Sequence, residues 1–404
     1  MKIDLLHYSA PPIVGGVESV VAHHARLMAK AGHQVRILAG RGAQFEPSIP
    51  FLSIPLIDSR HPEILDVKQE LDRGHVSPKF DLLTNAIIQL LEPILKETDL
   101  LIAHNVCSLH KNLPLTAALR LILDNPGTPR LILWHHDLSW MTPRYRSELY
   151  PGYPWNLLCT AWPGAKHVVV SELRQQELSG LIGISQERIA LVPNGIDAVQ
   201  FLGLQPQTRD LIDQLDLLTA EPLLLLPVRI TPRKNIELAL ETLAAVSKDY
   251  PKGMLVITGP LGPHNPANVQ YFERLKNLRS ELKLVGRAHF LADLTSDYLP
   301  DVIIADFYRL ADALLLPSHE EGFGIPILEA GLVGMPIFCT DIPPLRSLAG
   351  ENAVYFSPTS KADLVARKIY VNLSRNRAHS MRIHVRKNFS WKQIYTQHIA
   401  HLLE

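Results

Sequence analysis

The stretch from Leu314 to Pro336, which reads LLLPSHEEGFGIPILEAGLVGMP, constrains the fold more than any other part of the chain. Its leucines, followed by Pro317, are typical of the end of a buried strand. A polar loop with glycines comes next, and Pro326 suits the first turn of a helix because its missing N–H costs nothing there. The stretch therefore predicts a strand, a loop and a helix that meet at one corner.

Two glutamates flank this corner: Glu321 lies in the loop and Glu329 within about the first turn of the helix. Free backbone N–H groups at a helix start favour an anion, but two carboxylates would repel a bare phosphate. The pair is explained if the ligand also carries hydroxyl groups, as a sugar and a ribose do. The alternative is a surface loop with two solvated glutamates, which the glycines, the proline and the corner disfavour.

The same stretch resembles a known donor-site signature. EGFGIPILEAGLVGMP is similar to the motif of the retaining glycosyltransferases of family four, the glycosyl transferases group 1. That motif has two glutamates separated by seven residues, the first followed by Gly-Phe-Gly. The resemblance implies that Glu321 contacts the donor sugar and Glu329 the ribose hydroxyls, with Gly324 and Ile325 beside them. It also implies the GT-B fold, in which two doubly wound parallel-sheet, Rossmann-like domains face a central cleft.

A second strand–loop–helix unit, LLLLPVRITPRKNIELALETLAAV, has a strand at Leu223 to Val228 and a helix at Ile236 to Val246. Arg229 and Lys234 bracket its loop. Two cations at a helix N-terminus oppose the helix dipole, so they do not stabilise the fold by themselves. A bound pyrophosphate would compensate for this cost, which explains why both cations are present. The same spacing occurs in the family, which implies that both side chains hold the donor pyrophosphate.

The N-terminal region predicts a similar unit, with a strand at Ile3 to Tyr8, a loop ending in two glycines and a helix at Val17 to Ala31. Such glycines let backbone N–H groups approach a phosphate or sugar, although a glycine pair alone often only makes a turn. The pattern resembles the first unit of the same family, which implies that Gly16 lies against the donor phosphates. A nicotinamide dehydrogenase is disfavoured because the three-glycine spacing is missing.

Histidines follow the buried strand in LILWHHDLSW, where polar groups begin as the strand ends. Ligands of open α/β sheets bind at the carboxyl ends of strands. A histidine bonded only to a neighbouring loop is the alternative. The resemblance implies a His-Asp pair near the donor sugar and acceptor, which His136 and Asp137 fit better than His135 does. We therefore expect Glu321 and His136 to be the catalytic residues.

A group of aromatic and basic residues comes next. One explanation is that these residues bind a sugar ring and an anionic acceptor group. The other is that they pack as a loop over the cleft. The sequence favours neither explanation. The members of the group are Trp140, Arg144, Tyr145, Arg146 and Tyr150.

The remaining pattern predicts the organisation of the chain. We expect an N-terminal acceptor-side domain at 1–197, a helical linker at 198–221 and a donor-binding domain at 222–388, with a final helix at 389–404 completing the first domain. Residues 41–80 are expected to form a loop with one helix, and Leu282 to Val285 a strand.

Composition limits the classes of molecule that the protein is expected to bind. A chain of 404 residues fits two α/β domains, and 40 basic against 40 acidic residues give no global attraction to nucleic acid, with membrane contact at most peripheral. Three cysteines without metal-ligand spacing are expected to be buried in a reducing compartment, and no metal site or cofactor is predicted. Without a signal or membrane-spanning run, the protein is expected to be cytoplasmic.

The resemblance thus implies a metal-independent, retaining hexosyltransferase. The donor would be a UDP-, GDP- or ADP-sugar, and the acceptor a hydroxyl of a small molecule, a saccharide or a lipid-linked group. The alternatives are a disaccharide phosphorylase or synthase on the same fold, a nucleotide-sugar epimerase and a non-catalytic sugar-binding module.

Overall fold

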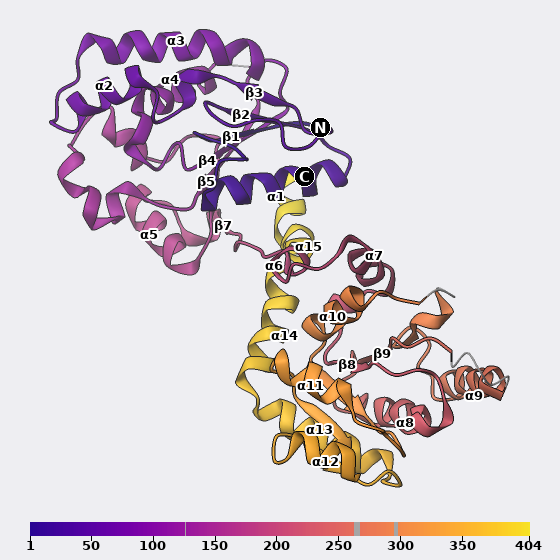
Figure 1. Ribbon diagram of the computed structural model, residues 1–404. Coiled ribbons are helices and arrows are strands. Elements are labelled where there is room, and N and C mark those ends of the chain that lie inside the picture. The colour runs from indigo at the N-terminus through magenta and orange to yellow at the C-terminus, as the bar shows by residue number, and fades with distance from the viewer. Residues whose placement is uncertain (126, 262–266, 295–297) are drawn as a thin grey trace. The chain divides into compact units, whose positions relative to one another are not determined.

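The computed structural model describes residues 1–125, 127–261, 267–294 and 298–404. The chain divides into two compact units, Met1–Gly195 with Trp391–Glu404, and Ile196–Ser390. Each unit is built around one parallel sheet covered by helices (Figure 1). The predicted α/β class, two doubly wound parallel sheets, is confirmed.

The sheet of the first unit has seven parallel strands in the order β3-β2-β1-β4-β5-β6-β7. The order reverses between β1 and β4, and ligands of open α/β sheets bind at such a switch point. The strands are β1 (Lys2–Leu6), β2 (Gln34–Ala39), β3 (Phe51–Ser53), β4 (Leu100–His104), β5 (Arg130–His135), β6 (Lys166–Val169) and β7 (Ile189–Leu191).

Helices cover both faces of this sheet because successive side chains of a strand point to opposite faces. Leu5 of β1 packs in one cluster with Val21, whereas Leu6 packs in another with Phe80 and Leu115. The helices are α1 (Gly16–Lys30), α2 (Pro62–Leu71), α3 (Pro78–Leu95), α4 (Leu113–Leu123), α5 (Glu172–Ile182), α15 (Trp391–Ile394) and α16 (Ala400–Leu403).

The sheet of the second unit has six parallel strands in the order β10-β9-β8-β11-β12-β13. Its switch point lies between β8 and β11, the strands that precede the two predicted donor loops. The strands are β8 (Leu223–Leu226), β9 (Met254–Ile257), β10 (Ala288–Phe290), β11 (Ala313–Leu316), β12 (Ile337–Thr340) and β13 (Val354–Phe356).

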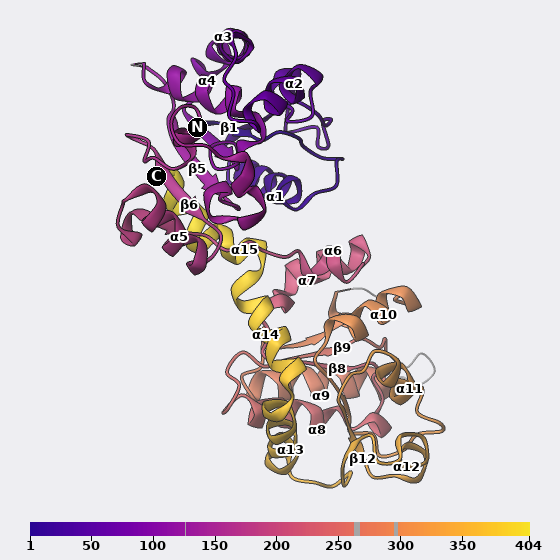
Figure 2. The same ribbon diagram turned by 90° about the vertical axis from the view of Figure 1, so that its left-hand side faces the viewer.

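The helices of the second unit also lie on both faces of their sheet. Figures 1 and 2 show α8, α9 and α13 together on one face, and α10 with α11 on the other. The helices are α6 (Ala198–Phe201), α7 (Pro206–Leu215), α8 (Ile236–Val246), α9 (Ala267–Glu281), α10 (Asp301–Leu310), α11 (Ile325–Leu332), α12 (Pro343–Ala349), α13 (Ala362–Arg375) and α14 (Arg377–Phe389).

The segment 198–221, expected as a linker, folds into the second unit. It holds α6 and α7, and its Ile212 and Leu217 are buried in the core of that unit. At the other end of the chain, Trp391 and Ile394 are buried in the core of the first unit.

Some local predictions are confirmed and others are wrong. The helix Ile236–Val246 has the expected bounds. The expected strand at Leu282 to Val285 is absent because Lys283 and Gly286 have φ angles of 56° and 81°, which interrupt an extended chain. The strand β10 begins two residues after Gly286.

Residues 41–80 also differ from the expectation of a loop with one helix. They contain β3, the whole of α2 and the start of α3 at Pro78. The strand β3 has only three residues, two half-exposed and one exposed, so its sequence shows no alternation of buried and exposed positions. It is recognised only by its pairing with β2. The proline and histidine content from Gly259 to Asn268 predicts a loop, and this stretch includes 262–266, which lie outside the described residues.

Cys107 and Cys339 are buried as expected, whereas Cys159 is partly exposed. Among the helices of the described residues, none has the length and apolar character needed to cross a bilayer.

Candidate functional site

The loop before α11 holds Glu321 in a buried ion pair. Lys234 Nζ lies 2.6 Å from Glu321 Oε1 and 2.7 Å from Oε2, and Ser318 Oγ donates to Oε1 at 2.7 Å. The two charged side chains are only 9% and 7% exposed. Burial lowers the pKa of Lys234, and the adjacent Glu321 carboxylate opposes that shift. The structure thus brings together two residues that the sequence assigned to separate tasks.

The segment before α8 fixes Lys234 in place. Asn235 adopts the left-handed conformation, with φ 52°, and its Nδ2 donates to Pro317 O at 3.0 Å and to Pro358 O at 3.1 Å. The loops that follow β8 and β11 are therefore tied together at the carboxyl edge of the sheet.

The corner at the start of α11 needs a glycine. Gly324 has φ 104°, and a Cβ there would lie 2.6 Å from Leu345 Cδ2. Pro326 stands in the first turn of α11, as the sequence predicts. The geometry explains why the motif reads Gly-Ile-Pro at this point: the chain turns sharply into a short helix.

A hollow of about 250 Å³ lies at the same edge of the second sheet. Arg229, Ile325 and Glu329, all predicted site residues, line it together. In the described residues Arg229 has no carboxylate within 4 Å of its guanidinium. Burial and the neighbouring Glu329 carboxylate raise the pKa of the Tyr308 hydroxyl.

Other residues of this hollow were missed by sequence reasoning. They include Thr258, Gly259, Tyr298 and Asp301. Gly259 was available as a signal, because a glycine directly after a buried strand marks a close approach of two chain segments. A Cβ on Gly259 would lie 2.0 Å from Val228 O.

In the first unit, Gly16 begins α1 and lines a hollow of about 640 Å³ at the switch point of that sheet. A Cβ on Gly16 would meet no atom within 4 Å, so packing within the chain does not require glycine there. A Cβ on Gly15 would lie 2.0 Å from Glu18 Oε2, the end of a flexible side chain that would have to move.

His136 directly follows β5 and is almost fully buried. Its Nε2 lies 3.2 Å from His104 Nδ1, and its backbone N–H donates to Asn105 Oδ1 at 2.7 Å. Burial, followed by the charge of His7, lowers the pKa of His136 to about 3, so the imidazole is neutral at neutral pH. Asp137, rather than His136, lines the hollow.

His135 points to a different partner, with its Nε2 3.0 Å from His167 Nδ1. Burial lowers its pKa well below the usual range. The two neighbouring histidines therefore belong to separate hydrogen-bonded pairs.

Members of the aromatic and basic group at 140–150 pack against each other and against neighbouring segments of the first unit. Trp140 Nε1 donates to Trp155 O at 3.2 Å, and Tyr150 OH donates to Asp72 O at 3.1 Å. The Arg144 guanidinium lies 4.7 Å from the centre of the Tyr145 ring. Of the two explanations that the sequence left open, these contacts favour a packed loop.

The fold also assembles three possible metal ligands that no sequence spacing indicates. Ligand atoms of Asp72, His110 and Glu148 lie within 4.8 Å of one another. Lys68 Nζ contacts Asp72 at 2.6 Å and Glu148 at 3.0 Å, so an ammonium already pairs with both carboxylates.

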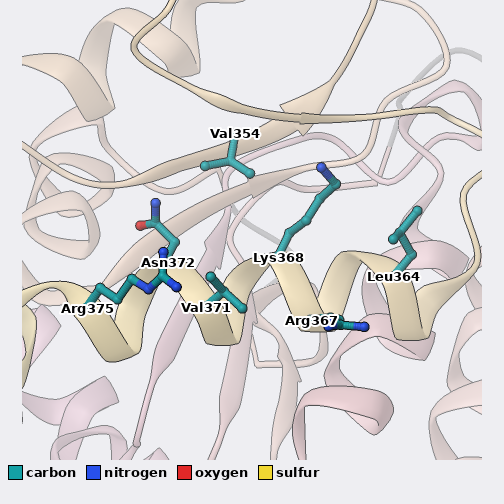
Figure 3. A pocket seen from close by; sticks show the side chains of 7 residues that line it. All are labelled: Val354, Leu364, Arg367, Lys368, Val371, Asn372 and Arg375. Atoms are coloured by element: carbon teal, nitrogen blue, oxygen red, sulfur yellow. The ribbon is translucent and has the colours of Figure 1, made fainter.

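A third hollow, of about 450 Å³, lies between α13 and Val354 of β13 and holds none of the predicted site residues. Figure 3 shows Lys368 and Asn372 pointing from the helix toward the strand. Arg367 and Arg375 lie on the same stretch of α13.

Comparison with protein families assigns both units. The model of the family described as glycosyl transferases group 1 matches residues 207–388, and the one described as glycosyltransferase family 4 matches 14–200. The chain belongs to the group 1 glycosyltransferases. With a parallel sheet in each unit, this group 1 glycosyltransferase has the GT-B fold class that the sequence predicts.

Curated relatives of this group 1 glycosyltransferase include two synthases. The mannosylglucosylglycerate synthase of Petrotoga mobilis is 28% identical over 264 residues, which cover 61% of this chain and 60% of the relative. The mannosylfructose-phosphate synthase of Agrobacterium fabrum is 28% identical over 228 residues, with 54% and 48% covered. The match thus spans about half the length of these relatives.

Solved structures similar to the chain include a glycosyltransferase from Rickettsia africae ESF-5, with 17% identity and a TM-score of 0.38 over 98% of this chain and 96% of that one. Another is Anabaena Alr3699/HepE in complex with UDP, with 18% identity and a TM-score of 0.37 over 100% and 99%.

Proposed function

We propose that this chain transfers a sugar from a nucleotide-activated donor to a hydroxyl group of an acceptor, with retention of configuration at the anomeric carbon. One observation carries the proposal: Arg229, Ile325 and Glu329 line one hollow, next to the loops that hold the Lys234–Glu321 pair. Cations suit a diphosphate, and carboxylates suit the hydroxyls of a sugar and a ribose.

Binding of the donor would rearrange the Lys234–Glu321 ion pair. A diphosphate bound near Arg229 would compete with Glu321 for the Lys234 ammonium, since both are oxyanions. The Glu321 carboxylate would then be free to accept hydrogen bonds from the sugar hydroxyls. The resting ion pair would thereby keep a buried carboxylate neutralised until the donor arrives.

In the chemical step the bond between the anomeric carbon and the diphosphate oxygen breaks, and its electron pair stays on the leaving diphosphate. Arg229, Lys234 and the N–H groups at the starts of α8 and α11 would stabilise that charge. The acceptor oxygen bonds to the anomeric carbon on the face that the diphosphate leaves, and its proton passes to a diphosphate oxygen. Every atom and charge is then accounted for without a metal or a cofactor.

His136 would act by hydrogen bonding. Its pKa of about 3 leaves it without a positive charge at neutral pH, so it would position a hydroxyl and would not supply a proton as an imidazolium. We also propose that the protein works in the cytoplasm.

The donor is tested by thermal shift with UDP-, GDP- and ADP-sugars. A ligand at 100 times its dissociation constant should add about 2.7 kcal/mol of stability. Arg229→Ala with Lys234→Ala should lose that shift. The control is Lys248→Ala with Arg274→Ala, which removes the same charge from exposed positions of the same unit. An unchanged shift in the first variant would refute the diphosphate site.

The reaction is tested by mass spectrometry of acceptor mixtures with the best donor, with and without EDTA, and by NMR of the product anomer. We expect a retained configuration and EDTA-insensitive transfer. A sugar product from donor alone would instead indicate an epimerase, and phosphate-dependent disaccharide cleavage without a nucleotide effect would indicate a phosphorylase.

A further inference from the structure

His104 and His136 form a buried hydrogen-bonded pair at the carboxyl edge of the first sheet. His104 ends β4, and His136 directly follows β5, the neighbouring strand. His104 Nδ1 lies 3.2 Å from His136 Nε2. Burial lowers the pKa of both imidazoles, that of His104 well below the usual range and that of His136 to about 3. Both rings are therefore neutral at neutral pH, so each carries one N–H group, and one ring donates to the other.

Asn105 fixes the main chain on both sides of this pair. Its Oδ1 accepts hydrogen bonds from the backbone N–H groups of His136 at 2.7 Å and of Asp137 at 3.1 Å. Its own N–H donates to Trp134 O at 2.8 Å. The φ angle of Asn105 is 60°, in the left-handed region that asparagine tolerates better than most residues. Because Asn105 follows His104 directly, it ties the end of β4 to the end of β5.

The far side of the His104 ring decides the direction of the hydrogen bond. His104 Nε2 is buried and has no hydrogen-bond partner in the described residues. The ring stacks on Trp134, whose buried indole N–H also lacks an acceptor among these residues. If His136 donated, the His104 proton would lie on Nε2 and would be a second buried donor without an acceptor. If His104 donates from Nδ1, its Nε2 carries only a lone pair. The second arrangement is favoured, because buried N–H groups without partners are costly and rare.

We propose that His104 donates from Nδ1 to His136 Nε2 and thereby places the His136 proton on Nδ1, so that His136 offers the substrate an N–H donor. The proposal rests on the proposed function, because it gives His136 a direction of hydrogen bonding in the same reaction. In the described part of the chain His136 Nδ1 has no hydrogen-bond partner, so it is available to an oxygen of the donor sugar or of the acceptor. His104 is fully buried and acts through His136, as a positioning residue.

The position of this proton determines what His136 can do in the reaction. A lone pair on His136 Nδ1 could remove the proton of the acceptor hydroxyl, whereas an N–H group can only donate to an oxygen. With the proton on Nδ1, His136 orients an oxygen, and the acceptor proton passes to the leaving diphosphate, as in the proposed reaction. The hydrogen bond from His104 therefore excludes His136 as a general base.

The first test locates the protons by long-range proton–nitrogen NMR of the whole protein, labelled with ¹⁵N-histidine, at neutral pH and without ligand. A protonated imidazole nitrogen and one with a lone pair resonate in well-separated ranges. We expect Nδ1 of both His104 and His136 to be protonated and both Nε2 atoms to carry lone pairs. The signals are assigned by their absence in His104→Asn and in His136→Asn. A proton on Nε2 of either residue overturns the proposal.

The second test compares His104→Asn with His104→Leu, whose new side chains have nearly the same shape. The asparagine amide can donate in place of the lost Nδ1–H group, whereas leucine has no donor. His104→Leu should lower kcat by about 10-fold, the loss expected of one hydrogen bond, and His104→Asn should keep most of the wild-type kcat. The nucleotide-induced melting shift should be unchanged in both. Equal kcat values in the two variants would show that His104 only fills space, which overturns the positioning role.

The matched control is His167→Leu, which removes a buried imidazole from the neighbouring pair of His135 and His167. This variant should lower the melting temperature, but kcat and the proton positions of His136 should stay unchanged. A loss of kcat equal to that of His104→Leu would assign the effect to packing of the sheet and would overturn the proposal. If the wild type neither binds nor uses a nucleotide sugar, the proposed function fails, whereas the spectra without ligand still decide where the His136 proton lies.

Discussion

At the scale of single residues, the decisive contacts join positions that are distant in sequence. Lys234 and Glu321 are 87 residues apart, yet their charged atoms lie 2.6 Å apart. The sequence pattern identified both residues, because each stands at a strand–loop–helix corner. It gave no sign that they pair, since ion pairs depend on how two loops meet in space. The Asp72, His110 and Glu148 group was invisible for the same reason.

Glu321→Gln should therefore affect both chemistry and stability. Losing a preorganised charge should slow transfer by about 10²- to 10³-fold, and leaving Lys234 buried without its carboxylate should destabilise the second unit by about 3 kcal/mol. Urea unfolding and initial rates measure the two effects. Adding Lys234→Met should restore much of the stability but none of the activity, and a fully active Glu321→Gln enzyme would exclude the catalytic role.

Buried histidines should make the first unit sensitive to acid. Burial lowers the pKa of His24 and His136 to about 3 and that of His167 to about 4, whereas an unfolded chain binds those protons near pH 6.5. The stabilising contribution is complete above pH 6.5 and is lost as the pH falls toward the folded-state pKa of each histidine, about 4 for His167 and about 3 for the other two. Each group contributes a slope of about 1.4 kcal/mol per pH unit between these limits.

Calorimetry in buffers of different ionisation enthalpy checks this prediction. Unfolding at pH 5 should be accompanied by proton uptake, which His136→Asn should reduce. Unfolding without proton uptake at that pH would contradict the assignment of neutral histidines.

At the scale of elements, regular helices and glycine-marked corners could be predicted, whereas short strands and their bounds could not. The bounds of α8 and the start of α11 follow from apolar spacing and from Pro326. The strand β10 was misplaced because a short apolar run does not reveal the left-handed residues Lys283 and Gly286 that interrupt it. The backbone conformation of these two residues therefore determines where the strand begins.

Two glycines of the same motif should respond in opposite ways to alanine. Gly324→Ala should lower stability by about 1–3 kcal/mol, because φ is 104° and Leu345 occupies the space. Gly331→Ala, within α11 and with no atom within 4 Å of its Cβ, should raise stability by up to about 1 kcal/mol. Melting curves of both variants provide the comparison, and equal destabilisation would contradict the described corner.

At the scale of the whole molecule, the family resemblance implied two doubly wound parallel sheets, and the structure has both. Such sheets arise because βαβ connections favour parallel pairing. The sites on the two units follow from the switch points of those sheets. What binds there could not be derived from topology, since the same fold serves many reactions. That information depends on particular side chains, such as Arg229 and Glu329 of the proposed donor site.

Hydrogen exchange should show which segments of each unit are protected when a nucleotide sugar binds. A bound nucleotide sugar should protect residues 227–235 and 317–326 of the second unit, where the donor loops lie. Residues 12–18 should also gain protection if Gly16 approaches the diphosphate. Mass spectrometry of peptides from these segments measures the change, and unchanged exchange at 12–18 would remove Gly16 from the donor site.

The return of Trp391–Glu404 to the first unit has a consequence for biosynthesis. Ile394, Ile399 and Leu403 complete a buried cluster of that unit, and the Trp391 ring closes over Gly195. A ribosome releases Ile196–Ser390 before these residues, so the second unit can fold during translation while the first still lacks part of its interior. The nascent first unit therefore keeps an exposed apolar face until Trp391–Glu404, which is synthesised after the second unit, becomes available.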